Sequence, residues 1–454
     1  MNATTRTARR PIPDALTPAQ EKEFARRRRQ LMRAMGHGCI AVIPSAPVRV
    51  RNHDVEYPYR QDSDFLYLTG FTEPGAVAVL VPGRPQGEYV LFCRERDPVM
   101  ETWHGRRAGQ EGAVDRYGAD DSFPITDVDD ILPGLLEDRE RVYATLGRDQ
   151  EFDQKLMGWV NRLKEQSRSG VHPPHEFVSL EYLLHDMRLF KSRAEIKAMG
   201  EAGAISTRAH VRAMKACQPG MMEYEIEAEL LYEFRRAGTE PAYPSIVGGG
   251  ANGCILHYTE NNARLHEGDL LLIDAGCEYQ GYASDITRTF PVNGQFTPAQ
   301  RELYELVLEA QHAAIEKTVP GNHWNDPHMA AVKTLTKGLV SLGLLKGRPA
   351  QLIKDGAYRQ FYMHRTGHWL GLDVHDVGDY KLDEAWRLLE PGMVMTVEPG
   401  LYIPAGSRGV PKRFHDIGIR IEDDVRVTRD GHSVLTAHCP KEPDEIEALV
   451  GTGC

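Results

Sequence analysis

The apolar positions in the first part of the chain form short runs that are separated by helical segments. Runs typical of β-strands lie at Cys39–Ile43, Ala76–Val81 and Tyr89–Cys93. The stretch Ser167–Pro174, which contains Gly and Pro, then interrupts this pattern as a connection between domains would. We therefore predict a small N-terminal α/β domain over residues 1–176.

The second part of the chain opens with helical signals and continues with strand patterns. Ser192 and Glu195 have the spacing of a capping box, and the segment Thr297–Gln300 has the cap of a later helix. Strand patterns occur at Asp269–Ile273, Ala283–Phe290, Met393–Glu398 and Ile417–Val427. Because turns and one helix separate these strands, we predict helices on a largely antiparallel sheet over residues 177–454, and an α+β fold class.

The composition of the 454 residues, with 41% hydrophobic and 26% charged, is typical of a folded globular protein. A formal charge of −11 gives no general attraction for nucleic acid or anionic lipid. No apolar run approaches the roughly 18 residues of a membrane span. We therefore expect neither nucleic acid nor a membrane as a partner. The basic run Arg26–Arg29 follows the capping segment Thr17–Gln20, and we interpret it as the solvated face of an amphipathic helix rather than a nucleic-acid patch.

The cysteines and the N-terminus bear on the compartment. Seven cysteines are scattered without paired metal-type spacing, which is typical of reduced thiols in the cytoplasm. The first ten residues are basic and Thr-rich, lack an apolar signal core and precede Pro11 and Pro13. We expect a flexible tail here rather than a targeting segment.

Two aspartates follow the most apolar predicted strand. Asp274 ends the run Leu270–Ile273, and Asp285 lies in the next predicted strand. Antiparallel pairing would bring both carboxylates to one face, where two anions require a compensating cation. The alternative is a pair of solvated acids in turns.

Histidines and further acids support a metal site. His364, His368 and His375 fall within twelve residues, close to glycines that allow near approach of a ligand. For His364 a buried structural role is an equal alternative. Glu398 ends another apolar strand, where an unpaired carboxylate is costly.

Alternation along a later predicted strand completes the candidate set. Ile419 and Ile421 would face the core, so Arg420 and Glu422 would face the site; a surface strand with salt bridges is the alternative. The proposed ligands are four carboxylates and one imidazole: Asp274, Asp285, His368, Glu398 and Glu422. This set matches two divalent cations, with oxygen-rich ligation favouring Mn²⁺ and with Co²⁺, Zn²⁺ or Fe²⁺ as alternatives.

The order of these five residues and their surroundings resemble the pita-bread metallopeptidases and, within them, the aminopeptidase P family. The matching segments are IDAGCEYQGYASDITRTFPV, HWLGLDVHDVG, TVEPGLY, IRIEDD and GCILHYTEN, with EYPYRQDSDFLYLTGF and ETWHGRR in the first domain. The resemblance implies a creatinase-like first domain and a pita-bread catalytic domain, whose helices cover a curved, mainly antiparallel sheet.

The resemblance also implies an activity and roles for individual residues. The expected reaction is hydrolysis of the bond between any N-terminal residue and a following proline, by a metal-bridged hydroxide with Glu398 as proton shuttle. Further catalytic positions are His257, His375 and Arg420, and substrate-binding positions are Tyr402, Trp103, Asp54 and His364. Trp103 and Asp54 match positions that reach a neighbouring subunit in the family, which implies a homotetramer or homodimer.

Three alternatives stay open at this point. A prolidase would share the fold and ligands but cleave only Xaa-Pro dipeptides. A creatinase-like enzyme would work without metal, and a binding relative would have lost catalysis. The complete ligand set argues against the creatinase-like enzyme and the binding relative, whereas the prolidase is separated only by comparing Xaa-Pro dipeptides with Xaa-Pro-Yaa tripeptides.

Overall fold

A computed structural model describes residues 16–453, which divide into two units between Met187 and Arg188. The division lies after the predicted boundary at residue 176, because strand β8 (Glu176–Ser179) pairs with β7 (Arg141–Ala144) in the sheet of the first unit. The predicted N-terminal tail with Pro11 and Pro13 lies outside the described residues, as does Cys454.

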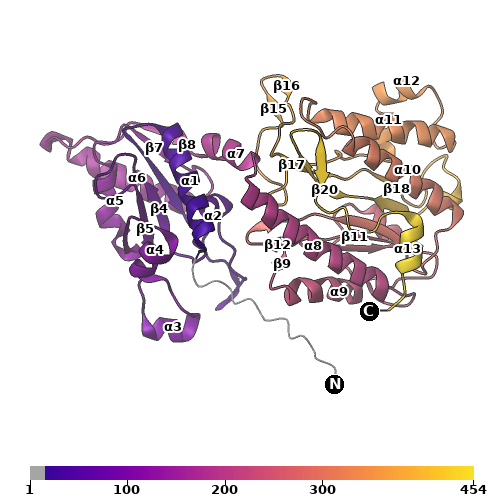
Figure 1. The fold of residues 1–454 in the computed structure, drawn as a ribbon, viewed down its shortest axis with the longest axis horizontal. Helices are drawn as coiled ribbons and strands as arrows, with labels where there is room; N and C mark the ends of the chain where they lie inside the picture. Colours follow the sequence, from indigo (N-terminus) through magenta and orange to yellow (C-terminus); the bar gives the residue numbers. More distant parts are fainter. Residues whose placement is uncertain (1–15, 454) are drawn as a thin grey trace. The chain divides into compact units, whose positions relative to one another are not determined.

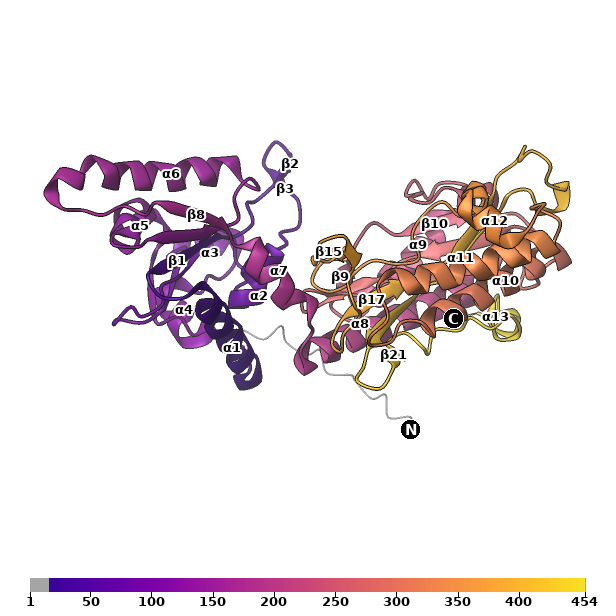
Figure 2. The ribbon, with the colours of Figure 1, turned by 90° about the horizontal axis from the view of Figure 1, so that it is seen from above.

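The first unit is built on a mixed six-stranded sheet in the order β6-β5-β4-β1-β7-β8. The predicted apolar runs form β1 (Cys39–Pro44), β4 (Val77–Leu80) and β5 (Tyr89–Cys93). Strand β6 (Asp121–Pro124) pairs with β5. Outside this sheet, β2 (Val50–Asn52) and β3 (Val55–Glu56) form a separate hairpin. Figure 2 shows α6 on one side of the six-stranded sheet and α1 on the other. The helices are α1 (Pro18–Met35), α2 (Ser63–Thr69), α3 (Pro98–His104), α4 (Gly109–Tyr117), α5 (Val128–Leu136), α6 (Gln150–Glu165) and α7 (Glu181–Leu189).

The interpretation of the basic run as a solvated face holds for Arg26 and Arg29, which are exposed, and is wrong for the two residues between them. Arg27 and Arg28 are not solvated but buried, with 3% and 6% exposure. Their guanidinium groups donate to the carbonyls of Tyr67 and Leu68 and lie over the rings of Tyr67 and Tyr89. Arg27 and Arg28 therefore fasten α1 to the rest of the first unit through cation–π contacts and carbonyl hydrogen bonds.

The second unit contains the predicted helices and their caps. Ser192 and Thr297 form capping boxes with Glu195 and Gln300, as expected. Helices α8 and α9 pack side by side, as do α10 and α11, and strands β11 and β18 appear between the two pairs in the view of Figure 1. The helices are α8 (Arg193–Ala216), α9 (Glu223–Arg236), α10 (Pro298–Ile315), α11 (Asn325–Ser341), α12 (Pro349–Lys354) and α13 (Pro443–Leu449).

Every described strand pair in the second unit is antiparallel, which confirms the α+β prediction. The sheets are β10-β11-β14 (Ile246–Gly249, Leu270–Asp274, Thr287–Pro291), β13-β12-β9 (Tyr282–Ala283, Cys277–Tyr279, Glu240–Pro241), β17-β20-β21 (Val394–Val397, Asp423–Val427, His432–Val434), β18-β19 (Gly400–Ile403, Ile417–Arg420) and β15-β16 (Lys381–Leu382, Ala385–Trp386).

Two predicted strands are interrupted where site residues lie. Asp285 falls in a break between β13 and β14, because its amide donates to the carboxylate of Asp424 at 3.2 Å instead of to a neighbouring strand. The predicted strand 417–427 divides into β19 and β20, which belong to different sheets, with Glu422 between them. Because of these breaks, the two carboxylates need not follow the alternation of side chains between the two faces of a sheet.

The described residues contain no helix long and apolar enough to cross a bilayer. The six described cysteines are free, and all but Cys254 are buried.

A buried ion network anchors the loop that leads to His375. The carboxylate of Asp376 accepts from Arg188 at 2.5 Å and from Lys191 at 3.0 Å, and Arg188 also donates to Asp373 at 2.8 Å. Burial alone would raise the pKa of Asp376, but the charges of Lys191 and Arg188 lower it below its ordinary value. The charged form of Asp376 therefore stabilises the fold.

We expect Asp376→Asn to lower the free energy of unfolding of the metal-free protein by about 3 kcal/mol at neutral pH, because the buried Lys191 loses its carboxylate partner and Arg188 loses one of its carboxylate partners. A carboxylate whose pKa is lowered on folding stabilises the folded state at pH values above its pKa in the unfolded chain, which is about 3.9. This stabilisation is lost as the pH falls through the pKa of the folded state. Denaturant unfolding at several pH values measures this difference.

The exposed Asp430 offers the control Asp430→Asn, which should change the unfolding free energy little. A deficit of Asp376→Asn that stays constant below about pH 4 would contradict the assigned ion network.

Candidate metal centre

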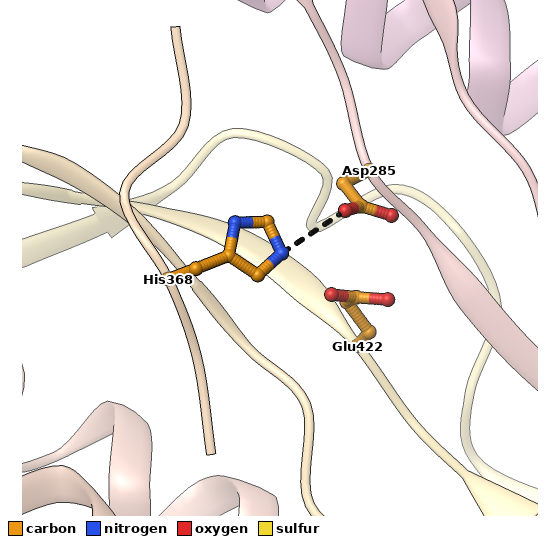
Figure 3. Close-up of side chains that lie close together, drawn as sticks. All are labelled: Asp285, His368 and Glu422. Atoms are coloured by element: carbon orange, nitrogen blue, oxygen red, sulfur yellow. Dashed lines mark ion pairs between the residues drawn. The ribbon is translucent and has the colours of Figure 1, made fainter. Parts of the chain in front are cut away.

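Three predicted ligands converge in the second unit (Figure 3). Asp285 lies between β13 and β14, His368 precedes β17, and Glu422 lies between β19 and β20. Each offers one ligand atom, and these atoms all lie within 4.8 Å of one another. Segments that are distant in the sequence thus form a single cluster of two carboxylates and one imidazole.

The hydrogen bonding of His368 directs its second nitrogen to this cluster. Its Nδ1–H donates to the carbonyl of Trp369 at 3.0 Å, which leaves Nε2 3.4 Å from Asp285 Oδ2. Burial would lower the pKa of His368, but the hydrogen bond to Asp285 and the charge of Glu398 raise it to about 9. Protons and a metal ion therefore compete for Nε2.

The other two predicted ligands line the same cavity, which has a volume of about 580 Å³. Glu398 Oε1 lies 3.8 Å from His368 Nε2. Asp274 accepts from Arg420 at 2.6 Å, and its other oxygen lies 2.7 Å from the hydroxyl of Tyr243. All five predicted ligands therefore line one cavity, with three of them in the close cluster.

The carboxylates strongly affect one another in this cavity. Burial raises the pKa of Asp274 above its ordinary value and that of Glu398 to about 7. Burial and the charges of Asp285 and Glu398 raise the pKa of Glu422. Burial alone would raise the pKa of Asp285 too, but the hydrogen bond and charge of His368 lower it. The site is short of positive charge.

The donor set fits divalent cations. Carboxylate oxygens and a neutral imidazole nitrogen are ligands for Mn²⁺, Co²⁺, Fe²⁺ and Zn²⁺, and four carboxylates balance two such ions. An imidazole held in the tautomer that frees Nε2 toward the carboxylates is the arrangement that a metal ligand requires.

The predicted histidines and Arg420 also reach the cavity. His257, His364, His375 and Arg420 line it, and the rings of His368 and His375 lie 4.4 Å apart. Burial lowers the pKa of His375, and the charge of His368 lowers it further.

Tyr402 is fully buried and is not among the residues that line the cavity. Its hydroxyl accepts from Arg420 at 3.1 Å and donates to His364 Nε2 at 2.8 Å. Burial lowers the pKa of His364 to about 3, with a contribution from Arg420, so this ring is neutral. In the structure Tyr402 thus connects Arg420 to His364, and a direct contact with substrate stays a prediction.

Trp103 and Asp54 lie in the first unit. Trp103 is on α3 with 78% of its surface exposed, and Asp54 is exposed in the turn between β2 and β3. Their assignment to a substrate site stays a prediction.

Three residues of the centre were missed from the sequence. Tyr243 lies 2.5 Å from Asp285 Oδ1 as well as 2.7 Å from Asp274, so its single hydrogen can be donated to either. The carboxylate of Asp424 accepts a hydrogen bond from the backbone N–H of Asp285. Glu223, on α9, accepts from Gly249, Asn252, Tyr258 and Ala263 and so holds the segment that carries His257. A single Tyr before Pro244 carries no sequence signal of a metal site. Asp424 could have been noticed from the sequence, because it lies two residues after the predicted ligand Glu422.

The cluster of two carboxylates and one imidazole could hold a metal ion and is of the kind that metallohydrolases use. The chain belongs to metallopeptidase family M24: that family matches residues 197–429, and "Aminopeptidase P, N-terminal domain" matches residues 24–143. The resemblance found from the sequence, including the two-domain fold, is confirmed.

The relatives cover almost the entire chain. The Xaa-Pro aminopeptidase of Escherichia coli (strain K12) is 48% identical over 437 residues, which are 96% of this chain and 99% of that protein. The structure of Pseudomonas aeruginosa aminopeptidase PepP has a TM-score of 0.94 and 60% identity, covering 94% of this chain and 97% of that one. Zn-substituted E. coli aminopeptidase P in complex with product has a TM-score of 0.92 and 48% identity, covering 94% and 98%.

We expect Tyr243→Phe to weaken metal binding about tenfold, because the lost hydroxyl leaves Asp274 and Asp285 less well oriented. Calorimetric titration of the metal-free protein with Mn²⁺ measures the affinity. The matched control is Tyr279→Phe, which removes a hydroxyl that accepts from Gln280 at the surface. Equal affinities in the two variants would show that Tyr243 does not orient the ligands.

Proposed function

We propose that the chain is a dinuclear metal-dependent Xaa-Pro aminopeptidase, which hydrolyses the bond between an N-terminal residue and a following proline. The observation that carries the proposal is the convergence of Asp285, His368 and Glu422 in a cavity that Asp274 and Glu398 also line. The name of the E. coli relative, at near-complete coverage of both chains, supports the same activity.

The residues that would hold the metal ions are Asp274, Asp285, His368, Glu398 and Glu422. When bound, the ions lower the pKa of the attacking water and polarise the scissile carbonyl. Glu398 would take a proton at a carboxylate oxygen and pass it to the departing proline nitrogen. In the metal-free site burial raises the pKa of Glu398 to about 7.

Other side chains would bind and orient the substrate. His257 and His375 line the cavity and can donate hydrogen bonds to the carbonyl oxygen as negative charge develops on it. Arg420 orients Asp274 through its 2.6 Å ion pair, while Tyr402 and His364 extend this hydrogen-bonded chain.

The cavity wall supports recognition of proline. Apolar side chains of Pro244, Ile246, Leu256 and Val374 line it together with the metal ligands. A proline nitrogen in a peptide carries no hydrogen and its ring fixes φ, so a site for proline gains from an apolar wall and needs no acceptor.

The metal identity is part of this proposal. Mn²⁺ suits the oxygen-rich ligands, and Co²⁺, Zn²⁺ or Fe²⁺ are alternatives. A Zn-substituted form of the E. coli relative supports binding of more than one metal by this type of centre.

Peptide assays test the function. With Mn²⁺ bound, we expect the enzyme to release alanine from Ala-Pro-Ala with a kcat/KM at least about 100-fold above that for Ala-Ala-Ala. The reason is that the apolar wall of the cavity favours a substrate with a proline ring. Chelation should abolish both activities and Mn²⁺ should restore them.

The dipeptide Ala-Pro separates the closest alternative. Cleavage of Ala-Pro without cleavage of Ala-Pro-Ala would replace the aminopeptidase by a prolidase. Undiminished activity in metal-depleted protein would favour a creatinase-like mechanism, and no activity with any metal would favour a binding relative.

We further propose a homotetramer or homodimer in the cytoplasm. The large exposed surface of Trp103 on α3 supports a role in subunit contact, since solvent-exposed Trp side chains are enriched at interfaces. The buried free cysteines are consistent with a reducing compartment.

We expect the wild type to sediment as a tetramer or dimer and Trp103→Ala to shift toward smaller species, because an aromatic anchor is lost. Analytical ultracentrifugation measures both, with Tyr182→Ala as a control at another exposed aromatic residue of the first unit. A fully active wild-type monomer would remove the reason to assign Trp103 a role in assembly.

A further inference from the structure

Arg365 lines the same cavity as the metal ligands, although its side chain is largely exposed. It directly follows His364, whose Nδ1–H donates to the carbonyl of Arg365 at 2.7 Å. The backbone of Arg365 is therefore held by a histidine of the site, and its side chain begins at the cavity.

The guanidinium of Arg365 is fixed in place by uncharged groups. Its Nη1 donates to Asn325 Oδ1 at 2.7 Å, at the start of α11. The guanidinium carbon lies 4.8 Å from the ring centroid of Trp386, in β16, and 5.8 Å from that of Trp324. These contacts reduce the conformational freedom of a long side chain without neutralising its charge.

The missing counter-ion distinguishes Arg365 from three buried arginines of this unit. Arg188, Arg288 and Arg420 each pair with a carboxylate at 2.5 to 2.8 Å. Among the residues that the structure describes, no carboxylate forms an ion pair with Arg365. The guanidinium keeps donors free in the fork geometry that matches a carboxylate.

We propose that Arg365 is a specificity-determining residue that binds a carboxylate of the peptide substrate. The inference rests on the proposed peptidase function and adds the class of substrate that the cavity prefers. The carboxylate is supplied either by the free C-terminus of a short peptide or by an acidic side chain beyond the proline. Binding costs little ordering because Asn325 and Trp386 already position the guanidinium.

Four peptides distinguish the two sources. Ala-Pro-Ala and its C-terminal amide differ in the terminal carboxylate. Ala-Pro-Asp amide and Ala-Pro-Asn amide differ in a side-chain carboxylate. In the wild type we expect at least one of the two kcat/KM ratios, acid to amide or Asp to Asn, to be about tenfold.

Variants at position 365 assign the preference. Arg365→Gln should bring that ratio close to one, and Arg365→Lys should restore part of it because the charge remains while the fork is lost. Arg348→Gln, which removes an exposed arginine outside the residues that line the cavity, is the matched control and should leave the ratio unchanged.

Salt gives a second readout that needs no variant. Raising the ionic strength from about 0.05 M to about 0.5 M should reduce the wild-type ratio several-fold, because screening weakens an exposed ion pair. The proposal is overturned if both wild-type ratios are near one, or if Arg365→Gln leaves the larger ratio intact. Cleavage of the two peptides without a carboxylate, Ala-Pro-Ala amide and Ala-Pro-Asn amide, tests the peptidase function separately, since these peptides make no carboxylate contact.

Discussion

The structure of the second unit depends on placing four carboxylates in one largely buried cavity. Burial and mutual repulsion raise the pKa of Asp274, Glu398 and Glu422, which means that the metal-free site resists holding all of these charges at once. His368 and Arg420 each pair with one aspartate and offset only part of the charge. Two divalent cations carry four positive charges, as many as the four carboxylates carry negative ones, and the free energy of their binding would stabilise the site.

The fold meets this constraint by ending or interrupting strands at the ligands. Asp274 is the last residue of β11, while Asp285 and Glu422 lie in breaks between strands. Their side chains can therefore converge although they come from different sheets. Hydrogen bonds from Tyr243 and Arg420 hold Asp274 before any metal binds, so the orientation of this ligand is built into the protein.

The sequence indicated the five proposed ligands because strand ends, turn glycines and acid–histidine spacing are local signals, whereas His257 and Tyr402 were named only from the family resemblance. It did not predict the break at Asp285, since the competing acceptor for its amide, Asp424, lies 139 residues away. The burial of Arg28 likewise depends on the distant ring of Tyr89. Contacts of this kind follow from tertiary packing and leave no trace in periodicity. Tyr243 was missed for the same reason, because a single tyrosine is an ordinary core residue until its neighbours are known.

Anomalous X-ray diffraction from crystals grown with Mn²⁺ tests the central claim most directly, because it locates each metal ion independently of activity. We expect two peaks about 3.5–4 Å apart, each within ligand distance of side chains among Asp274, Asp285, His368, Glu398 and Glu422. A single peak, or peaks away from these side chains, would contradict the dinuclear centre.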